Sequence, residues 1–291
     1  MELIPNQTHY LYLKNGEVIN LKNGEQLECR PDKTESTVVF DVDYIHNIDT
    51  TNVERYFSLI MNNDTSKISR LQYLLGAVLS GEYLNSMIIF HGKESSGKSG
   101  LSTILNSLFG NSFVEVDQSI LTDSYDVIDV FETISFGEIS ENCKMSADTR
   151  ICNMMDSTIY FNIDDYRVGH LISNRTMSRK LDHHITPRSF VNNSVTIIER
   201  RNLCCIEPLT QQNKDRLLYV EFFKNESEHN DYSRLFNYIV NEKQGKRELL
   251  KWLVDGAIRF YNNKKLLSQY VLDEIESNSG NSACGRGFNS A

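Results

Sequence analysis

The sequence predicts an α/β protein whose core is a mainly parallel sheet, preceded by a small α+β domain and followed by C-terminal helices. Two observations predict this fold. Short apolar runs, typical of strands buried on both faces, alternate with amphipathic helical stretches. A glycine-rich loop joins one of these runs to the helix that follows it. The composition, 40% hydrophobic and 24% charged over 291 residues, is that of a globular chain.

Residues 1–84 are expected to form the small α+β region. Asn15-Gly16 and Asn23-Gly24 lie between apolar residues, which is a strong signal for hairpin turns, and Thr37–Phe40 is expected to be a further strand. From residue 53 to residue 80 the apolar positions recur at helical spacing, and Gly81 is the expected helix end.

Residues 85–225 are expected to form the core. Apolar residues at helical spacing predict a helix over 101–109 that ends at Gly110. The C-terminal helices fall in residues 226–276, at roughly 232–240 and 247–261, and residues 277–291, rich in Ser, Asn and Gly, are expected to be a disordered tail. Apolar runs predict four core strands, at Met87–Phe90, Thr133–Phe136, Ser194–Ile198 and Leu217–Phe223.

The first core strand leads directly into a phosphate-binding loop of the G-x-x-x-x-G-K-S type. Backbone N–H groups of such a loop, with the N-terminus of the following helix, surround a β-phosphate. Lys98 would neutralise phosphate oxygens and the Ser99 hydroxyl would bind Mg²⁺, so ATP and Mg²⁺ are the expected cofactors, bound in a P-loop NTPase core. The nucleotide-binding residues predicted here are Gly92, Lys93, Glu94, Ser95, Ser96, Gly97, Lys98 and Ser99.

Hydrolysis requires partners for this loop. Glu138 follows the second core strand and is the first choice for the acid that holds Mg²⁺ through water, and Glu141 is the second choice. Asn202 follows the third strand and is the candidate sensor of the γ-phosphate. Arg216 precedes the fourth strand and is the candidate cation for a neighbouring subunit's transition state.

A basic stretch between the acidic and sensor residues is the candidate DNA-contacting loop. Cationic and imidazole side chains suit phosphate contacts and base stacking. The paired histidines have no second cluster at ligand spacing, which argues against zinc. The residues proposed to contact DNA are Arg179, Lys180, His183 and His184.

The charge and the cysteine content restrict how the protein could bind DNA and in which compartment it would be found. With 30 Lys and Arg against 39 Asp and Glu the formal charge is −9, so cations that bind DNA would be confined to local loops. Six cysteines are too few for a disulfide scaffold, and neither a membrane span nor a signal peptide is evident. We expect a soluble intracellular protein, in the host cytoplasm or nucleus if the chain is viral.

The order of these motifs resembles the superfamily 3 helicases, in the branch of poxvirus-type and satellite-phage-type primase–helicases. Residues 13–21 resemble that family's N-terminal N-G-x-L-D-L segment, and residues 71–81 resemble the L-Q-x-x-L-G-x-x-L-T-G helix before its P-loop. Gly137-Glu138 with Glu141 resembles its acidic motif, Ser178–Leu181 its A-R-x-L segment, and Asn202 and Arg216 its sensor and arginine finger. The resemblance implies an AAA+-like core that assembles as a homo-hexamer.

The same resemblance implies ATP-driven translocation on single-stranded DNA or at a replication fork, in viral, phage or mobile-element DNA replication. A separate primase is then a candidate partner. Two alternatives remain open from the residues themselves. One is a nucleotide-binding scaffold or switch with eroded motor activity, and the other is a small-molecule phosphotransferase, against which the basic loop argues.

Overall fold

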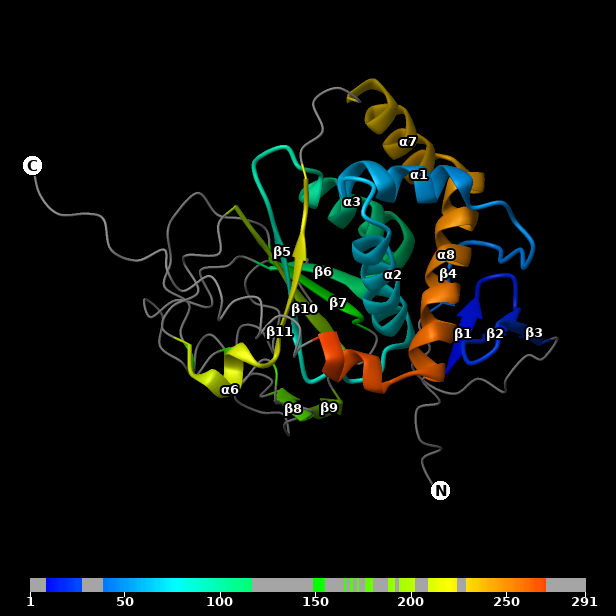
Figure 1. The fold of residues 1–291 in the computed structure, drawn as a ribbon. Coiled ribbons are helices and arrows are strands. Elements are labelled where there is room, and N and C mark those ends of the chain that lie inside the picture. Colours follow the sequence, from blue (N-terminus) through cyan, green and yellow to red (C-terminus); the bar gives the residue numbers. More distant parts are fainter. Residues whose placement is uncertain are drawn as a thin grey trace, which may run out of the picture.

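We describe the chain from a computed structural model. The residues described are 9–27, 39–116, 149–154, 165, 168–169, 172, 176–179, 188–191, 194–201, 209–223 and 229–270. Their main features are a five-stranded sheet, a layer of helices on one side of it, and a small four-stranded sheet beyond the helices (Figure 1).

The small sheet is built by the N-terminal residues in the order β3-β2-β1-β4. The first three strands are antiparallel neighbours, and β4 runs parallel to β1. Gly16 and Gly24 take φ values of 88° and 75° in the two turns, a region that favours glycine, which explains the two Asn-Gly pairs. The strands are β1 (Tyr10–Leu13), β2 (Val18–Asn20), β3 (Glu25–Leu27) and β4 (Val39–Phe40).

The central sheet has the order β11-β5-β10-β7-β6, and all of its strands are parallel. Side chains of β5 alternate between its faces: Ile88 and Phe90 join the core on the helical side, whereas Met87 and Ile89 join a second apolar cluster on the other face. Both faces are therefore buried, as the apolar runs predict. The strands are β5 (Met87–His91), β6 (Phe113–Val116), β7 (Ile151–Met154), β10 (Val195–Arg200) and β11 (Leu217–Glu221).

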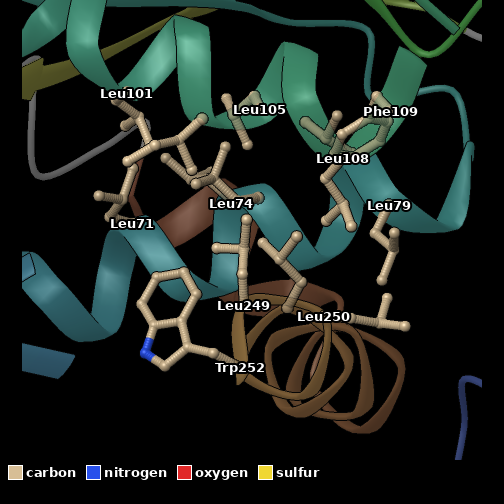
Figure 2. Packing of buried hydrophobic residues seen from close by; sticks show 14 of the residues in the cluster. Leu71, Leu74, Leu79, Leu101, Leu105, Leu108, Phe109, Leu249, Leu250 and Trp252 are labelled. Atoms are coloured by element: carbon tan, nitrogen blue, oxygen red, sulfur yellow. The ribbon is translucent and has the colours of Figure 1, made fainter. Parts of the chain in front are cut away.

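Five helices lie together on one side of the central sheet (Figure 1). Helix α2 packs between α3 and α8 through leucines of all three helices and Trp252 (Figure 2). Gly76 of α2 and Gly256 of α8 allow the two backbones to touch, since a Cβ at either position would overlap the other helix. The helices are α1 (Thr51–Ile60), α2 (Thr65–Ser80), α3 (Lys98–Phe109), α7 (His229–Asn241) and α8 (Lys243–Asn262).

Local signals mark the ends of α2 and α3. The Asp64 carboxylate accepts hydrogen bonds from the backbone N–H groups of Ser66 and Lys67, which caps the start of α2. Gly81, with φ of 67°, ends α2, and Gly110 follows the last residue of α3. The predicted helix ends at Gly81 and Gly110 are thus confirmed.

Helices from the three expected regions contribute to one hydrophobic core. Residues of α1 and α2, which lie before residue 85, pack with α3 and with α7 and α8, which lie after residue 225. The boundaries at residues 84, 225 and 276 stay predictions, and the expected tail over 277–291 lies outside the described residues.

The described residues also include a short strand pair and a one-turn helix. Strands β8 (Thr176–Arg179) and β9 (Arg188–Val191) form an antiparallel pair in which Arg179 lies opposite Arg188. The one-turn helix α6 (Gln211–Lys214) precedes β11. Within the ranges that the structure describes, every helix is too short or too polar to cross a membrane.

Candidate nucleotide-binding site

The phosphate-binding loop connects the end of β5 to the start of α3, as the sequence predicts. Gly97 precedes α3 with a φ of 99°, and a Cβ there would lie 2.8 Å from Cγ2 of Ile60. At Gly92 a Cβ would overlap the carbonyl oxygen of Phe222. Both glycines of the motif are therefore required by the packing of the loop against its neighbours as well as by its backbone conformation.

The Lys98 ammonium lies inside this loop. It donates hydrogen bonds to the carbonyl oxygens of Gly92 at 2.6 Å and Lys93 at 2.9 Å, and a longer one to Oγ of Ser96 at 3.3 Å. The residue is only 6% exposed. A cation held at the first turn of a helix, with the positive end of the helix dipole beside it, is suited to bind a phosphate group.

A buried polar network lies beneath the first turn of α3. The Ser99 hydroxyl donates to Oε2 of Glu199 at 2.7 Å, and the Ser102 hydroxyl donates to Oε1 at 2.6 Å. The Asn153 amide donates to the same Oε1 at 3.2 Å. Glu199 and Asn153 are fully buried, so the P-loop serine is connected to a carboxylate on the neighbouring strand β10.

Glu199 and Asn153 are not among the site residues that the sequence predicts. Glu199 directly follows the run Val195–Ile198, two positions beyond Ile197 and therefore on the same face of β10. A charged residue that continues the buried face of a strand is the signal that could have identified it. Its partners lie 46 to 100 positions away in the sequence, at distances that no local pattern reveals.

The end of β10 also lies beside the loop. The carbonyl of Arg200 accepts a hydrogen bond from the backbone N–H of Gly92 at 3.2 Å. Arg201 lies 3.4 Å from the Glu94 carboxylate of the loop, and both side chains are exposed. Asn202, the candidate sensor, is the next residue in the sequence and lies outside the described residues.

Arg216 lies at the other end of the sheet. Its carbonyl oxygen accepts the backbone N–H of Met87, where β5 begins, whereas the loop follows His91, where β5 ends. At about 3.3 Å per residue, the length of β5 separates the two places by about 13 Å. The structure therefore does not bring Arg216 to the phosphate-binding loop of its own chain.

Of the remaining predicted site residues, one has a described backbone and five lie outside the described residues. Glu138 and Glu141, Lys180, His183 and His184 lie outside the described residues, as does the expected strand Thr133–Phe136. For Arg179 the structure describes the backbone, in β8. In the described ranges, no three His, Cys, Asp or Glu side chains gather to hold a metal ion.

His91, the last residue of β5, lies directly before the loop. Burial lowers the pKa of its imidazole to about 4; the Glu221 carboxylate opposes this shift, while the charges of Lys67 and Lys98 add to it. Lys67 itself is paired with Glu221 at 2.7 Å. A neutral imidazole therefore stands beside the loop at neutral pH.

ATP with Mg²⁺ fits this set of residues. Lys98 and the start of α3 supply a buried cation and a helix N-terminus, which suit a triphosphate. Ser99 supplies a hydroxyl oxygen next to a carboxylate, and such oxygen groups are what Mg²⁺ prefers when it shares its shell with phosphates. In such a complex Lys98 would contact the phosphates and Ser99 would be the residue that holds the metal ion.

The central parallel sheet, its flanking helices and the loop define a P-loop NTPase-like α/β fold. Solved structures of the NrS-1 C-terminal region share this fold. One apo structure is 13% identical with a TM-score of 0.52 and covers 79% of this chain and 53% of that chain. Another is 12% identical with a TM-score of 0.51 and covers 90% and 60%.

A structure of the JCV helicase with a bound inhibitor is 12% identical, with a lower TM-score of 0.43 over 82% of this chain and 63% of that chain. The chain spans about half the length of the NrS-1 regions that it matches. At these identities the likeness concerns the fold alone. No protein-family model matches the chain, and no curated protein matches it.

Proposed function

We propose that this chain is an ATP-dependent DNA helicase of the superfamily 3 type, which works as a homo-hexameric ring in viral, phage or mobile-element DNA replication. The observation that carries the proposal is the Lys98 ammonium, held inside the loop between β5 and α3 of a parallel sheet. The order of the sequence motifs and the likeness to the NrS-1 C-terminal region, in fold, support it.

In this proposal the chain's own residues divide the work of hydrolysis. Lys98 binds phosphate oxygens, and Ser99 binds the Mg²⁺ that accompanies ATP and neutralises charge in the transition state. Glu138, with Glu141 as the alternative, polarises the attacking water, and Asn202 senses the γ-phosphate. Arg216 completes the site of a neighbouring subunit, in keeping with its distance from the loop of its own chain.

The β8–β9 hairpin supports the proposed DNA contact. Its register puts Arg179 opposite Arg188, so two arginines stand on neighbouring strands of a ribbon. Residues 180–187, which include Lys180, His183 and His184, connect these strands. A basic hairpin of this kind, repeated around a ring, would present phosphate-binding groups to a single strand in the channel.

Nucleotide binding is tested with Lys98→Ala, against Lys93→Ala as a matched control that removes the same charge from the exposed part of the same loop. We expect Lys98→Ala to lose binding of a fluorescent ATP analogue, while Lys93→Ala retains it, because the Lys98 ammonium lies inside the loop whereas Lys93 has an exposed side chain and would contact phosphate through its backbone. Binding that survives Lys98→Ala would remove the nucleotide site from this loop.

Motor function is tested by ATP hydrolysis with and without single-stranded DNA, followed by strand separation on a forked duplex. Stimulation of hydrolysis by DNA, lost in Lys98→Ala, is the expected result. ATP binding without any stimulation would favour the nucleotide-binding scaffold instead. Transfer of phosphate to a small molecule, with no effect of DNA, would favour a phosphotransferase.

A further inference from the structure

The carboxylate of Glu199 accepts more hydrogen bonds than are needed to join a helix to a sheet. Both of its oxygens accept hydrogen bonds, Oε2 from Ser99 and Oε1 from Ser102 and Asn153. The residue is completely buried at the carboxyl end of β10, directly below the first turn of α3. All three donors are side chains, from two different elements.

The surrounding face is apolar until this point. On β10, Val195 and Ile197 belong to the helical-side core, and Glu199 takes the next position on that face. On β7, Ile151 belongs to the same core and Asn153 is the next residue on the face. The polar residues thus begin where the strands reach the P-loop helix, and they lie nowhere else along these two faces in the described part of the sheet.

Stability alone gives little reason for a charge here. Removing a carboxylate from water costs several kcal/mol, and an apolar residue of similar volume often serves a fold equally well or better. Ser102 and Asn153 compensate the burial, yet they too are buried polar groups that an apolar contact would make unnecessary. The arrangement is better explained by the group that Glu199 reaches, which is the exposed Ser99 of the P-loop.

We infer that Glu199 is a positioning residue for the Mg²⁺ that accompanies the nucleotide, and that it acts through Ser99. The Ser99 hydroxyl directs its proton to Glu199, which leaves the lone pairs of its oxygen available to a cation. Hydrogen bonds of this kind from a metal ligand to a carboxylate orient the ligand and raise its basicity. Ser102 and Asn153 in turn fix the carboxylate. The inference rests on the proposed nucleotide binding.

The test measures the Mg²⁺ concentration that gives half-maximal binding of a fluorescent ATP analogue, together with binding in EDTA. Glu199→Gln is expected to raise this concentration about 10-fold or more and to change binding in EDTA little. Ser107→Ala is the control, because it removes a hydroxyl of the same helix that bonds the carbonyl oxygen of Ile104 and not the carboxylate, and it should leave the midpoint within about 2-fold.

Ser99→Ala and the double variant with Glu199→Gln show whether the effect passes through Ser99. If it does, the double variant requires no more Mg²⁺ than Ser99→Ala alone, whereas independent effects would multiply. A Glu199→Gln midpoint equal to that of Ser107→Ala, or a multiplicative double variant, overturns the inference. Wild-type protein that binds no nucleotide even with Mg²⁺ would instead overturn the proposed function.

Thermal unfolding of each variant separates a lost fold from a lost metal site. If Glu199→Gln does not fold, Glu199→Asp replaces it, because this change keeps the charge but shortens the side chain so that it no longer reaches Ser99. The same increase in the Mg²⁺ midpoint is expected. A Glu199→Asp protein that is folded and has the wild-type midpoint would contradict the inference as clearly.

Discussion

At the scale of single residues, His91 couples the stability of the protein to pH. Its pKa lies near 4 in the folded chain because the imidazole is buried, and near 6.5 in the unfolded chain. Between these values the unfolded state binds a proton that the folded state does not. His91 therefore contributes stability that is complete above pH 6.5 and is lost as the pH falls toward 4.

The prediction compares wild type with His91→Gln in urea unfolding at pH 7.5, 6.0 and 5.0. Between pH 7.5 and 5.0 the wild type should lose about 2 kcal/mol of stability relative to the variant. A constant difference in the free energy of unfolding above pH 7 reflects packing and does not affect the comparison of the pH dependence. Parallel pH profiles of the two proteins would show that His91 does not titrate in this way.

Among single residues, the sequence predicts those that belong to a local motif. Lys98 and Ser99 are identified by their fixed spacing to Gly92 and Gly97, because the groups of a phosphate-binding loop all come from one short segment of sequence. The place of Glu199 in the site depends on how closely α3 and β7 approach β10, which is a property of the tertiary structure. Site residues whose partners are distant in the sequence are therefore not predicted from the sequence.

At the scale of elements, the packing of α3 against α7 sets the size of the residue at position 100. A Cβ on Gly100 would overlap the hydroxyl oxygen of Tyr232 on α7 but would lie 3.4 Å from its Cζ, an ordinary contact distance. Tyr232 in turn packs against Tyr56 of α1, with ring centroids 5.4 Å apart. The start of the P-loop helix is therefore fitted to two other helices.

This fit predicts that Gly100→Ala destabilises the protein by about 1–3 kcal/mol through overpacking, although alanine favours helices more than glycine does. Tyr232→Phe removes the overlapping atom, so it should restore most of the loss in the double variant, with a coupling energy of about 1–2 kcal/mol. Thermal or urea unfolding of the four proteins in this cycle measures the coupling.

Asn106→Ala is the control for this cycle, because it places alanine on the exposed side of the same helix and should change stability by less than about 0.5 kcal/mol. Strictly additive effects of the Gly100 and Tyr232 substitutions would contradict the close approach of α3 and α7.

The helices and strands that have strong local sequence signals are confirmed. The order in which the strands pair comes from the structure and is not predicted by the sequence. The strand at Met87–Phe90 and the helix over 101–109 follow from apolar periodicity and a glycine stop. Strand β7, only four residues long and containing Asn153, has little local signal, yet it fills the place between β10 and β6. Its position is fixed by pairing with residues more than 30 positions away, which periodicity does not encode.

At the scale of the whole molecule, the separation of Arg216 from the loop bears on the proposed ring. Arg216 lies where the edge strand β11 begins, and the P-loop lies at the other end of the neighbouring strand β5. If Arg216 takes part in hydrolysis, it must reach a phosphate bound by another copy of the chain. Closed rings with head-to-tail contacts provide this geometry at every interface.

Two inactive variants should then restore each other. Arg216→Ala keeps an intact loop and should bind nucleotide with turnover reduced by about 10³. Lys98→Ala lacks the loop cation but keeps Arg216. In an equal mixture about a quarter of the head-to-tail interfaces pair an intact loop with an intact Arg216, so hydrolysis should exceed that of either variant alone.

The control mixes Arg216→Ala with the double variant Lys98→Ala/Arg216→Ala, which supplies neither group and should restore nothing. Recovery in the first mixture only would mean that the arginine acts between chains, because no single chain in that mixture carries both groups. A mixture no more active than its parts, in proteins shown by native mass to exchange subunits, would confine Arg216 to a structural role at the start of β11. Hydrolysis would then depend on cations near the loop of the same chain, among which Arg201 is already in place beside Glu94.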